Sequence, residues 1–215
     1  LVYDLGGTKL NVERRSESVY SKTFSDKILY ATLGDNGYVA VVTNSDINSC
    51  DMTIFDSKGK KIFFTSFNQK ILDITFTKGS KGCVVTTMMA QGGQFKSKQY
   101  CFNFNKDKEE WIGTPIVNLV LTSAINKDEN IILVGDHQYN VMSGSGEVKY
   151  TYSYTSELID KAIGDDITVL ILQNTQLRDT EMVIIDKYNK QNSVKLNNEF
   201  KKVLIGLVVA TILGF

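Results

Sequence analysis

The segment FDSKGKKIFFTSF, residues 55–67, contains a half-strand of apolar residues, a polar turn and then a full strand. The same pattern recurs in four other segments: VERRSESVYSKTF from Val12, FNKDKEEWIGTPI from Phe104, MSGSGEVKYTYSY from Met142 and IDKYNKQNSVKLN from Ile185. Successive segments begin 38 to 49 residues apart. A repeat of about 43 residues that is built from strands alone is typical of a β-propeller.

A second motif lies between these segments and completes the repeat. It begins at Ala31 (ATLGDNGYVAVV), Ile74 (ITFTKGSKGCVV), Ser123 (SAINKDENIILV) and Lys161 (KAIGDDITVLIL), each time 19 residues after the first motif. Together the two motifs predict four strands per repeat, and in the second repeat we expect them at 28–33, 38–44, 50–56 and 61–67. The turns between strands contain residues that tolerate tight backbone conformations, as in GDNG, DSKG, SGSG and DKYN.

We therefore expect one all-β domain over residues 1–215, a β-propeller of four-stranded antiparallel blades with about five blade repeats visible, as part of a larger ring. The expected blades are 1–24 (partial, without a first strand), 28–68, 71–116, 119–156, 158–199 and 201–215 (partial). Joining the two partial blades into a five-bladed ring is the alternative. In the last blade, apolar residues replace the turn of the motif from Leu204. This indicates either missing residues or a truncated membrane helix, although the 13-residue apolar run from Val203 is shorter than the ~20 residues that span a bilayer.

The links between the second and third strands are predicted to carry all of the length variation between repeats. Loops on a rigid scaffold are common binding sites, and this favours a functional surface at these links. Unconstrained drift in loop length is an equally good explanation. The candidate binding residues are Asp46, Asn48, Gln94, Lys96, His137, Gln138, Tyr139, Arg178 and Asp179.

Composition argues against several functional classes. The chain has 24 basic and 24 acidic residues, so no net positive charge favours nucleic acid. His137 is the only histidine and has no cysteine near it in sequence, so we expect no metal site and no cofactor. No nucleophile-elbow sequence is present, and we assign no catalytic residue.

Two cysteines lie where they could form a disulfide. Cys83 and Cys101 flank a hairpin centred on Gly92, and they would be bridged if their side chains faced each other across the strands. The alternative is that both are small buried apolar residues.

The segment DLGGT, residues 4–8, resembles the first phosphate loop of sugar kinases in the actin-like ATPase superfamily. There the glycine backbone approaches nucleotide phosphates, which would give Asp4, Gly6, Gly7 and Thr8 a role in ATP binding. No second phosphate loop and no alternation of strands with helices accompany it. The same residues fit the repeat as a strand, a turn and a strand.

Aromatic residues recur at corresponding positions of the repeats, and we interpret them as packing between blades. They are Tyr30, Tyr38, Phe55, Phe63, Phe67, Phe76, Phe102, Phe104 and Tyr152.

Four segments carry a family resemblance: LVYDLGGTKLNV, SKTFSDKILYATLGDNGYVAVVT, TIFDSKGKKIF and IIDKYNK. With them the chain resembles a family of β-propeller-like repeat domains, of the WD-repeat and quinoprotein kind, in Gram-positive gut anaerobes. The resemblance implies a membrane anchor N-terminal to this chain, a location outside the cytoplasmic membrane and further blades beyond residue 215. It brings no site residues. We expect a non-catalytic module that binds a protein or a cell-envelope glycan, with a glycan-active enzyme or the sugar-kinase-like site as the alternative.

Overall fold

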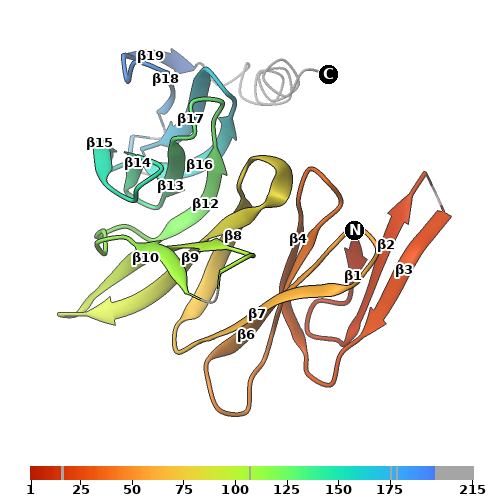
Figure 1. Ribbon diagram of the computed structural model, residues 1–215. Coiled ribbons are helices and arrows are strands. Elements are labelled where there is room, and N and C mark those ends of the chain that lie inside the picture. The colour runs from red at the N-terminus through yellow and green to blue at the C-terminus, as the bar shows by residue number, and fades with distance from the viewer. Residues whose placement is uncertain (16, 107, 175, 178, 197–215) are drawn as a thin grey trace. The chain divides into compact units, whose positions relative to one another are not determined.

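The computed structural model describes residues 1–15, 17–106, 108–174, 176–177 and 179–196, and almost all of this chain is strand or tight turn (Figure 1). The partial blade expected at 201–215 and the candidate residue Arg178 lie outside the described residues. The chain divides into two compact units, Leu1–Val117 and Asn118–Phe215.

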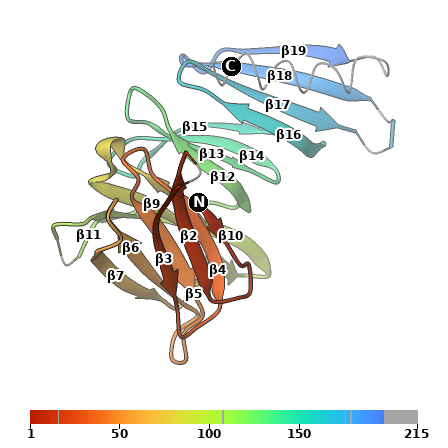
Figure 2. The same ribbon diagram turned by 90° about the vertical axis from the view of Figure 1, so that its right-hand side faces the viewer.

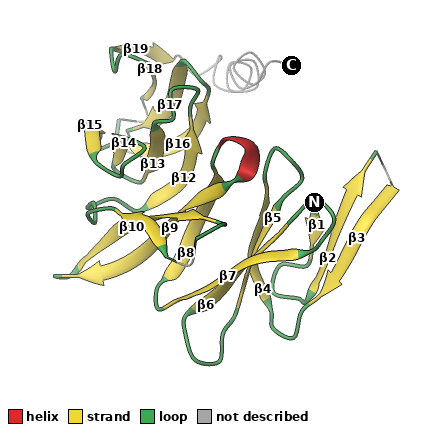
Figure 3. Ribbon diagram, in the orientation of Figure 1, coloured by secondary structure: helices red, strands yellow, loops and turns green. Residues whose placement is uncertain are grey.

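The first unit contains three antiparallel sheets whose strands follow one another in chain order. The first sheet has strands β1 (Val2–Tyr3), β2 (Lys9–Arg14) and β3 (Glu17–Thr23). The second has β4 (Ile28–Leu33), β5 (Val39–Thr43), β6 (Cys50–Phe55) and β7 (Lys61–Phe67). The third has β8 (Lys70–Phe76), β9 (Gly82–Gln91), β10 (Gln94–Asn103) and β11 (Glu109–Ile112), with a short 3-10 turn η1 (Lys78–Ser80), drawn red in Figure 3.

The second unit contains two more sheets of the same kind. One has β12 (Val120–Ile125), β13 (Ile131–Gly135), β14 (Gln138–Met142) and β15 (Val148–Ser153). The other has β16 (Glu157–Ile163), β17 (Ile167–Gln173), β18 (Thr180–Asp186) and β19 (Gln191–Leu196), which lie side by side in Figure 2.

The strands expected in the second repeat are confirmed to within one residue at each end by β4 to β7. In the first repeat, β1, β2 and β3 form a three-stranded sheet. Alternation of apolar and polar residues sets these strands, since one face of each must be buried.

Five of the turns after first and third strands share one geometry. In the turn 56–59, Asp56 N–H donates to the Lys60 carbonyl, and Gly59 N–H donates to the Asp56 carbonyl. The turns that begin at Gly34, Asn126, Ser143 and Asp186 repeat both hydrogen bonds. The fourth residue of each turn has a positive φ, as the left-handed position of a type I turn with a bulge requires.

The apolar core lies between neighbouring sheets within each unit. One cluster joins the β1–β3 sheet to the β4–β7 sheet, and a second joins the β4–β7 sheet to the β8–β11 sheet. A third lies between the two sheets of the second unit. The ring of Phe63 on β7 lies 5.5 Å from that of Phe102 on β10, so the predicted aromatic packing between sheets is confirmed there.

Candidate functional site

Each sheet has two different ends, because successive antiparallel strands reverse direction. We call the end that carries the strand 1–2 and 3–4 connections the turn end. The opposite end, which carries the strand 2–3 connections, is the link end. The links are residues 4–8, 44–49, 92–93, 136–137 and 174–179.

The structure places only some of the predicted binding residues in links. Asp46 and Asn48 lie in the link 44–49, His137 lies in the link 136–137, and Asp179 lies in the link 174–179. Gln94 and Lys96 lie instead in β10, and Gln138 and Tyr139 lie in β14.

The interpretation of Tyr139 as a loop residue is wrong. Its side chain is 3% exposed and belongs to the core of the second unit. The link before it is only two residues long, so β14 begins at Gln138 and its side chains alternate between core and surface from there. Tyr139 therefore stabilises the fold and does not face a partner.

The prediction that length varies only in the links also needs correction. In the β8–β11 sheet the extra residues lengthen β9 and β10 to ten residues each, and the link is a two-residue turn. Beyond the Lys70–Met88 pair, β9 and β10 pair only with each other, apart from one bridge between Ser97 and Ile116. Gly92 and Gly93 both have a positive φ, as a tight type I′ turn requires. The insertion thus forms a projecting hairpin.

The longer links are tied to the ends of neighbouring strands. In the link 44–49, Asn44 N–H donates to the Lys27 carbonyl, and Ser49 N–H donates to the Phe67 carbonyl. In the link 174–179, Asn174 N–H donates to the Asp179 carbonyl, and the Asn174 Oδ1 atom accepts from Leu177 N–H at 3.0 Å. These bonds close both links, and Ile47 and Leu177 within them are exposed.

The short link 136–137 is held by a polar network. Leu119 N–H donates to Asp136 Oδ1 at 2.8 Å, while the Asn118 amide donates to Asn140 Oδ1 at 3.0 Å. The Tyr154 hydroxyl donates to the Gly135 carbonyl, and burial together with the Asp136 charge raises the pKa of Tyr154 well above its ordinary value. His137 Nε2 lies 3.4 Å from Asp136 Oδ2, with its side chain largely exposed. The network explains the rigidity of the link and leaves the imidazole accessible.

Four links have a strongly exposed apolar side chain in them or beside them, and sequence reasoning missed these residues. Leu5 is 75% exposed, Ile47 92% and Leu177 71%, each within a link. Phe95, 59% exposed, is the second residue after the Gly92–Gly93 turn. We call the side chains of Leu5, Ile47, Phe95 and Leu177 the apolar tips. Single exposed apolar side chains are common on protein surfaces, so the informative feature here is that they recur at corresponding links. The signal in the sequence was one large apolar residue within each otherwise polar segment, as in DLGG, SDIN, GGQF and TQLR.

The phosphate-loop interpretation of residues 4–8 is not supported by the backbone. Gly6 N–H donates to the Ile28 carbonyl at 2.8 Å, and Gly7 N–H donates to the Asp4 carbonyl at 2.9 Å. A phosphate would need those N–H groups as donors. The segment is the link between β1 and β2, as the repeat predicted.

Cys83 and Cys101 are not bridged. Cys83 pairs with Phe102, and Cys101 pairs with Val84, because the hairpin is centred between Gly92 and Gly93. A shift of one residue turns a side chain to the other face of the sheet, so the two thiols point to opposite faces. All three cysteines are free and buried, and burial raises the pKa of Cys101 to about 11. The alternative of buried apolar residues is confirmed.

The described residues contain neither a cluster of metal ligands nor a membrane-spanning helix. Within the residues that the structure describes, no group of three or more His, Cys, Asp or Glu side chains is arranged to hold a metal ion. In the same part of the chain, no helix has the length and hydrophobicity needed to cross a bilayer.

Solved structures with the same fold are β-propellers. The propeller domain of the trilobed protease from Pyrococcus furiosus has a TM-score of 0.56 at 14% identity, with 78% of this chain and 56% of that chain covered. The WD40 domain of Neurospora crassa Pan2 has a TM-score of 0.58 at 13% identity, with 88% and 60% covered. A chain from the crystal structure of BBS1N in complex with ARL6DN has a TM-score of 0.58 at 9% identity, with 86% and 61% covered. This chain thus spans less than two thirds of each of these relatives.

The sheets and these similarities define the class: the chain is an all-β protein of the β-propeller fold, and each sheet is a blade. Residues 1–206 match the model of the family described as "Family of unknown function (DUF5711)", and the chain belongs to that family. No curated protein matches the sequence.

Proposed function

We propose that the protein is a non-catalytic binding module that holds a protein partner against the link end of the blades of its first unit. The observation that carries this proposal is the exposure of Leu5, Ile47 and Phe95 at or beside the three links of that unit. Apolar side chains surrounded by polar residues are the usual centre of a protein–protein contact. One of the similar propeller structures is itself a complex of two proteins, which supports the same kind of role here.

A glycan is the less suitable partner for this end of the blades. Sugar rings are covered with hydroxyl groups that must keep hydrogen bonds when they are buried. The side chains of Leu5 and Ile47 offer no donor or acceptor. A protein partner can instead cover these side chains with its own apolar residues.

A photo-crosslinking experiment tests this proposal. A benzoylphenylalanine residue is placed at position 47 or 95, and at position 188 as the control. Tyr188 is 79% exposed and lies at the turn end of the last blade, so it matches the tips in exposure but not in location. We expect the same protein adduct from positions 47 and 95, and none from position 188.

Competition makes the test specific. Excess unlabelled wild-type protein should remove the adduct, whereas an Ile47→Ser/Phe95→Ser protein should not. Equal adducts at all three positions, or adducts only with carbohydrate, would contradict a protein-binding link end.

We also propose that the module acts outside the cytoplasmic membrane, tethered by an anchor that lies outside this chain. The support is the family resemblance of the four segments quoted above. The test is a fusion of alkaline phosphatase to the C-terminus of the full reading frame, because this enzyme is active only after export. Phosphatase activity on intact cells is the expected result, and an inactive, stable fusion would contradict the proposal.

A further inference from the structure

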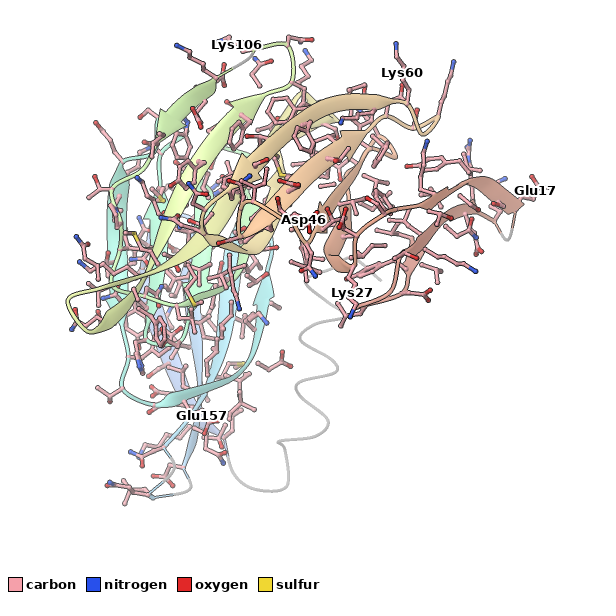
Figure 4. All side chains as sticks on the ribbon, turned by 90° about the horizontal axis from the view of Figure 1, so that it is seen from below. Glu17, Lys27, Asp46, Lys60, Lys106 and Glu157 are labelled. Atoms are coloured by element: carbon pink, nitrogen blue, oxygen red, sulfur yellow. The ribbon has the colours of Figure 1, made fainter. Side chains whose placement is uncertain are left out.

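A cleft of about 420 Å³ opens at the turn end of the first unit, between the β4–β7 blade and the β8–β11 blade. Its walls come from four connections: Tyr38 follows the turn 34–37, Lys60 and Lys61 follow the turn 56–59, Ser80 and Lys81 follow β8, and Asn105 follows β10. Figure 4 labels Lys60 on one of these connections and Lys106 on another. The volume is within the range of pockets that bind small molecules.

The cleft is cationic. Lys60, Lys61 and Lys81 line it, and no acidic side chain does. None of these lysines forms an ion pair with a described carboxylate. Two acids on the same hairpins, Asp56 and Glu110, are engaged elsewhere.

Asp56 and Glu110 show how those acids are engaged. The Asp56 Oδ1 atom accepts the N–H groups of Lys58 and Lys60, which lowers the pKa of that carboxyl. Glu110 accepts from Lys106 Nζ at 2.7 Å. Neither carboxylate lines the cleft. The Lys61 ammonium lies over the Phe64 ring, 4.2 Å from its centroid, so Lys60 and Lys81 carry the charge that is available to a ligand.

Ser80 is a second, independent feature of the same wall. It is 1% exposed, and its hydroxyl has no hydrogen-bond partner among the described residues. Its φ is 53°, a conformation that is costly for a residue other than glycine. A buried hydroxyl without a partner is also unfavourable. Such a combination is uncommon in a wall that serves only to hold the fold together.

The wall is also rigid. The Asn36 side-chain amide donates to the Gly79 carbonyl at 2.9 Å, which ties the turn of one blade to that of the next. A Cβ atom on Gly34 would lie 2.7 Å from the Ser80 hydroxyl, so the glycine lets the two turns pack closely. The cleft is therefore preformed, which reduces the entropy cost of binding.

We propose that this cleft binds a phosphate monoester, with the phosphate held by Lys60 and Lys81. All the cationic groups of the cleft are lysines, which act as point charges and suit a compact dianion. The cleft has no arginine that could hold a ligand by two parallel hydrogen bonds, so binding there depends on lysine point charges. The organic part of the ester would lie against Tyr38 and Phe104, which line the same space.

This site goes beyond the proposed partner-binding function, because it lies at the opposite end of the blades and uses none of the apolar tips. The signal in the sequence was a cluster of lysines in two successive turns, KGKK at 58–61 and KGSK at 78–81. Zero net charge for the whole chain concealed this local excess.

The test uses calorimetric titration of the whole chain with glycerol 3-phosphate, at an ionic strength kept constant with sodium chloride. The test variant is Lys60→Gln/Lys81→Gln. The matched control is Lys58→Gln/Lys78→Gln, which removes the same charge from the same two connections but alters no lining residue. We expect the test variant to bind at least tenfold more weakly, and the control to bind within about twofold of wild type.

Further ligands separate recognition of a monoester from simple attraction of an anion. Glycerol should not bind, and inorganic phosphate and the methyl diester of glycerol phosphate should each bind more weakly than the monoester. Equal weakening in both double variants would show diffuse attraction and overturn the proposal. Equal or tighter binding of inorganic phosphate or of the diester would overturn the assignment of a monoester.

Discussion

The two ends of the blades differ in how their connections are built. At the turn end, the connections that begin at Gly34, Asp56, Asn126, Ser143 and Asp186 share the same pair of backbone hydrogen bonds. At the link end, the connections range from two residues at 92–93 and 136–137 to six at 44–49 and 174–179. The difference shows that local backbone chemistry fixes one end of the scaffold, while the other end tolerates change and presents apolar side chains.

The largest expected effect contrasts a strand with the link that precedes it. Ile54 on β6 is fully buried, and Ile47 is almost fully exposed. Ile54→Ala should lower the free energy of unfolding by about 2–5 kcal/mol, because it removes buried methyl groups and leaves a cavity. Ile47→Ala should change that free energy by less than about 0.5 kcal/mol.

Urea unfolding of both isoleucine variants provides the measurement. A cost above about 1 kcal/mol for Ile47→Ala would mean that the link packs as part of the core. The exposed apolar tips would then need no partner, and the comparison between the two ends would fail.

The next largest expected effect compares a glycine in a turn with a glycine in a link. Gly59 in a turn and Gly92 in a link both have a positive φ. A Cβ atom on Gly59 would lie 2.8 Å from the Tyr20 ring, whereas nothing lies within 4 Å of one on Gly92. Gly92→Ala should cost only the backbone strain, about 1 kcal/mol. Gly59→Ala should cost at least about 2 kcal/mol, because the Tyr20 ring must also move.

Thermal unfolding of the two glycine variants gives the check. Equal decreases in melting temperature would mean that a methyl group fits at Gly59 in the turn as easily as at Gly92 in the link. A preserved difference, with wild-type spectra for both proteins, would localise the constraint to the contact with Tyr20.

The smallest expected effect concerns the carboxylate that caps a turn. Asp56 accepts two backbone N–H groups, and Asn126 does the same in the fourth blade. Asp56→Ala should therefore cost about 1 kcal/mol at pH 7, and Asp56→Asn should cost less. No comparable effect is expected from Asp46→Ala in a link, where no such pair of bonds is present among the described contacts.

The pH dependence follows from the lowered pKa of Asp56. A carboxyl with a lower pKa in the folded state stabilises the fold above its unfolded-state pKa, and that contribution is lost as the pH falls through the folded-state pKa. The difference in melting temperature between wild type and Asp56→Asn should therefore narrow in acid, below the ordinary pKa of aspartate. A difference that stays constant from pH 7 to pH 2 would show that the charge of Asp56 has no role.

The sequence predicts the strands and the regular turns of this protein better than it predicts the links. Strands β4 to β7 were predicted to within a residue, because alternation and turn residues act locally. A bridge between Cys83 and Cys101 requires the hairpin to be centred on residue 92. The centre lies between residues 92 and 93, so the two side chains point to opposite faces of the sheet. The prediction that Tyr139 lies in a loop was wrong because the link before it has only two residues, so Tyr139 is already part of β14. Sequence alone did not show that Ile47 is exposed or that Ser80 lies in a cleft, because both depend on packing between segments far apart in the chain.

The placement of the core between blades has a consequence for how such a chain changes over evolutionary time. In the first unit, the β4–β7 blade contributes one face to each of two apolar clusters. Duplication of a gene segment that encodes one blade therefore adds one complete interface and leaves the number of uncovered faces unchanged. Relatives of this protein should differ in length by whole blades, and loss of half a blade should be selected against.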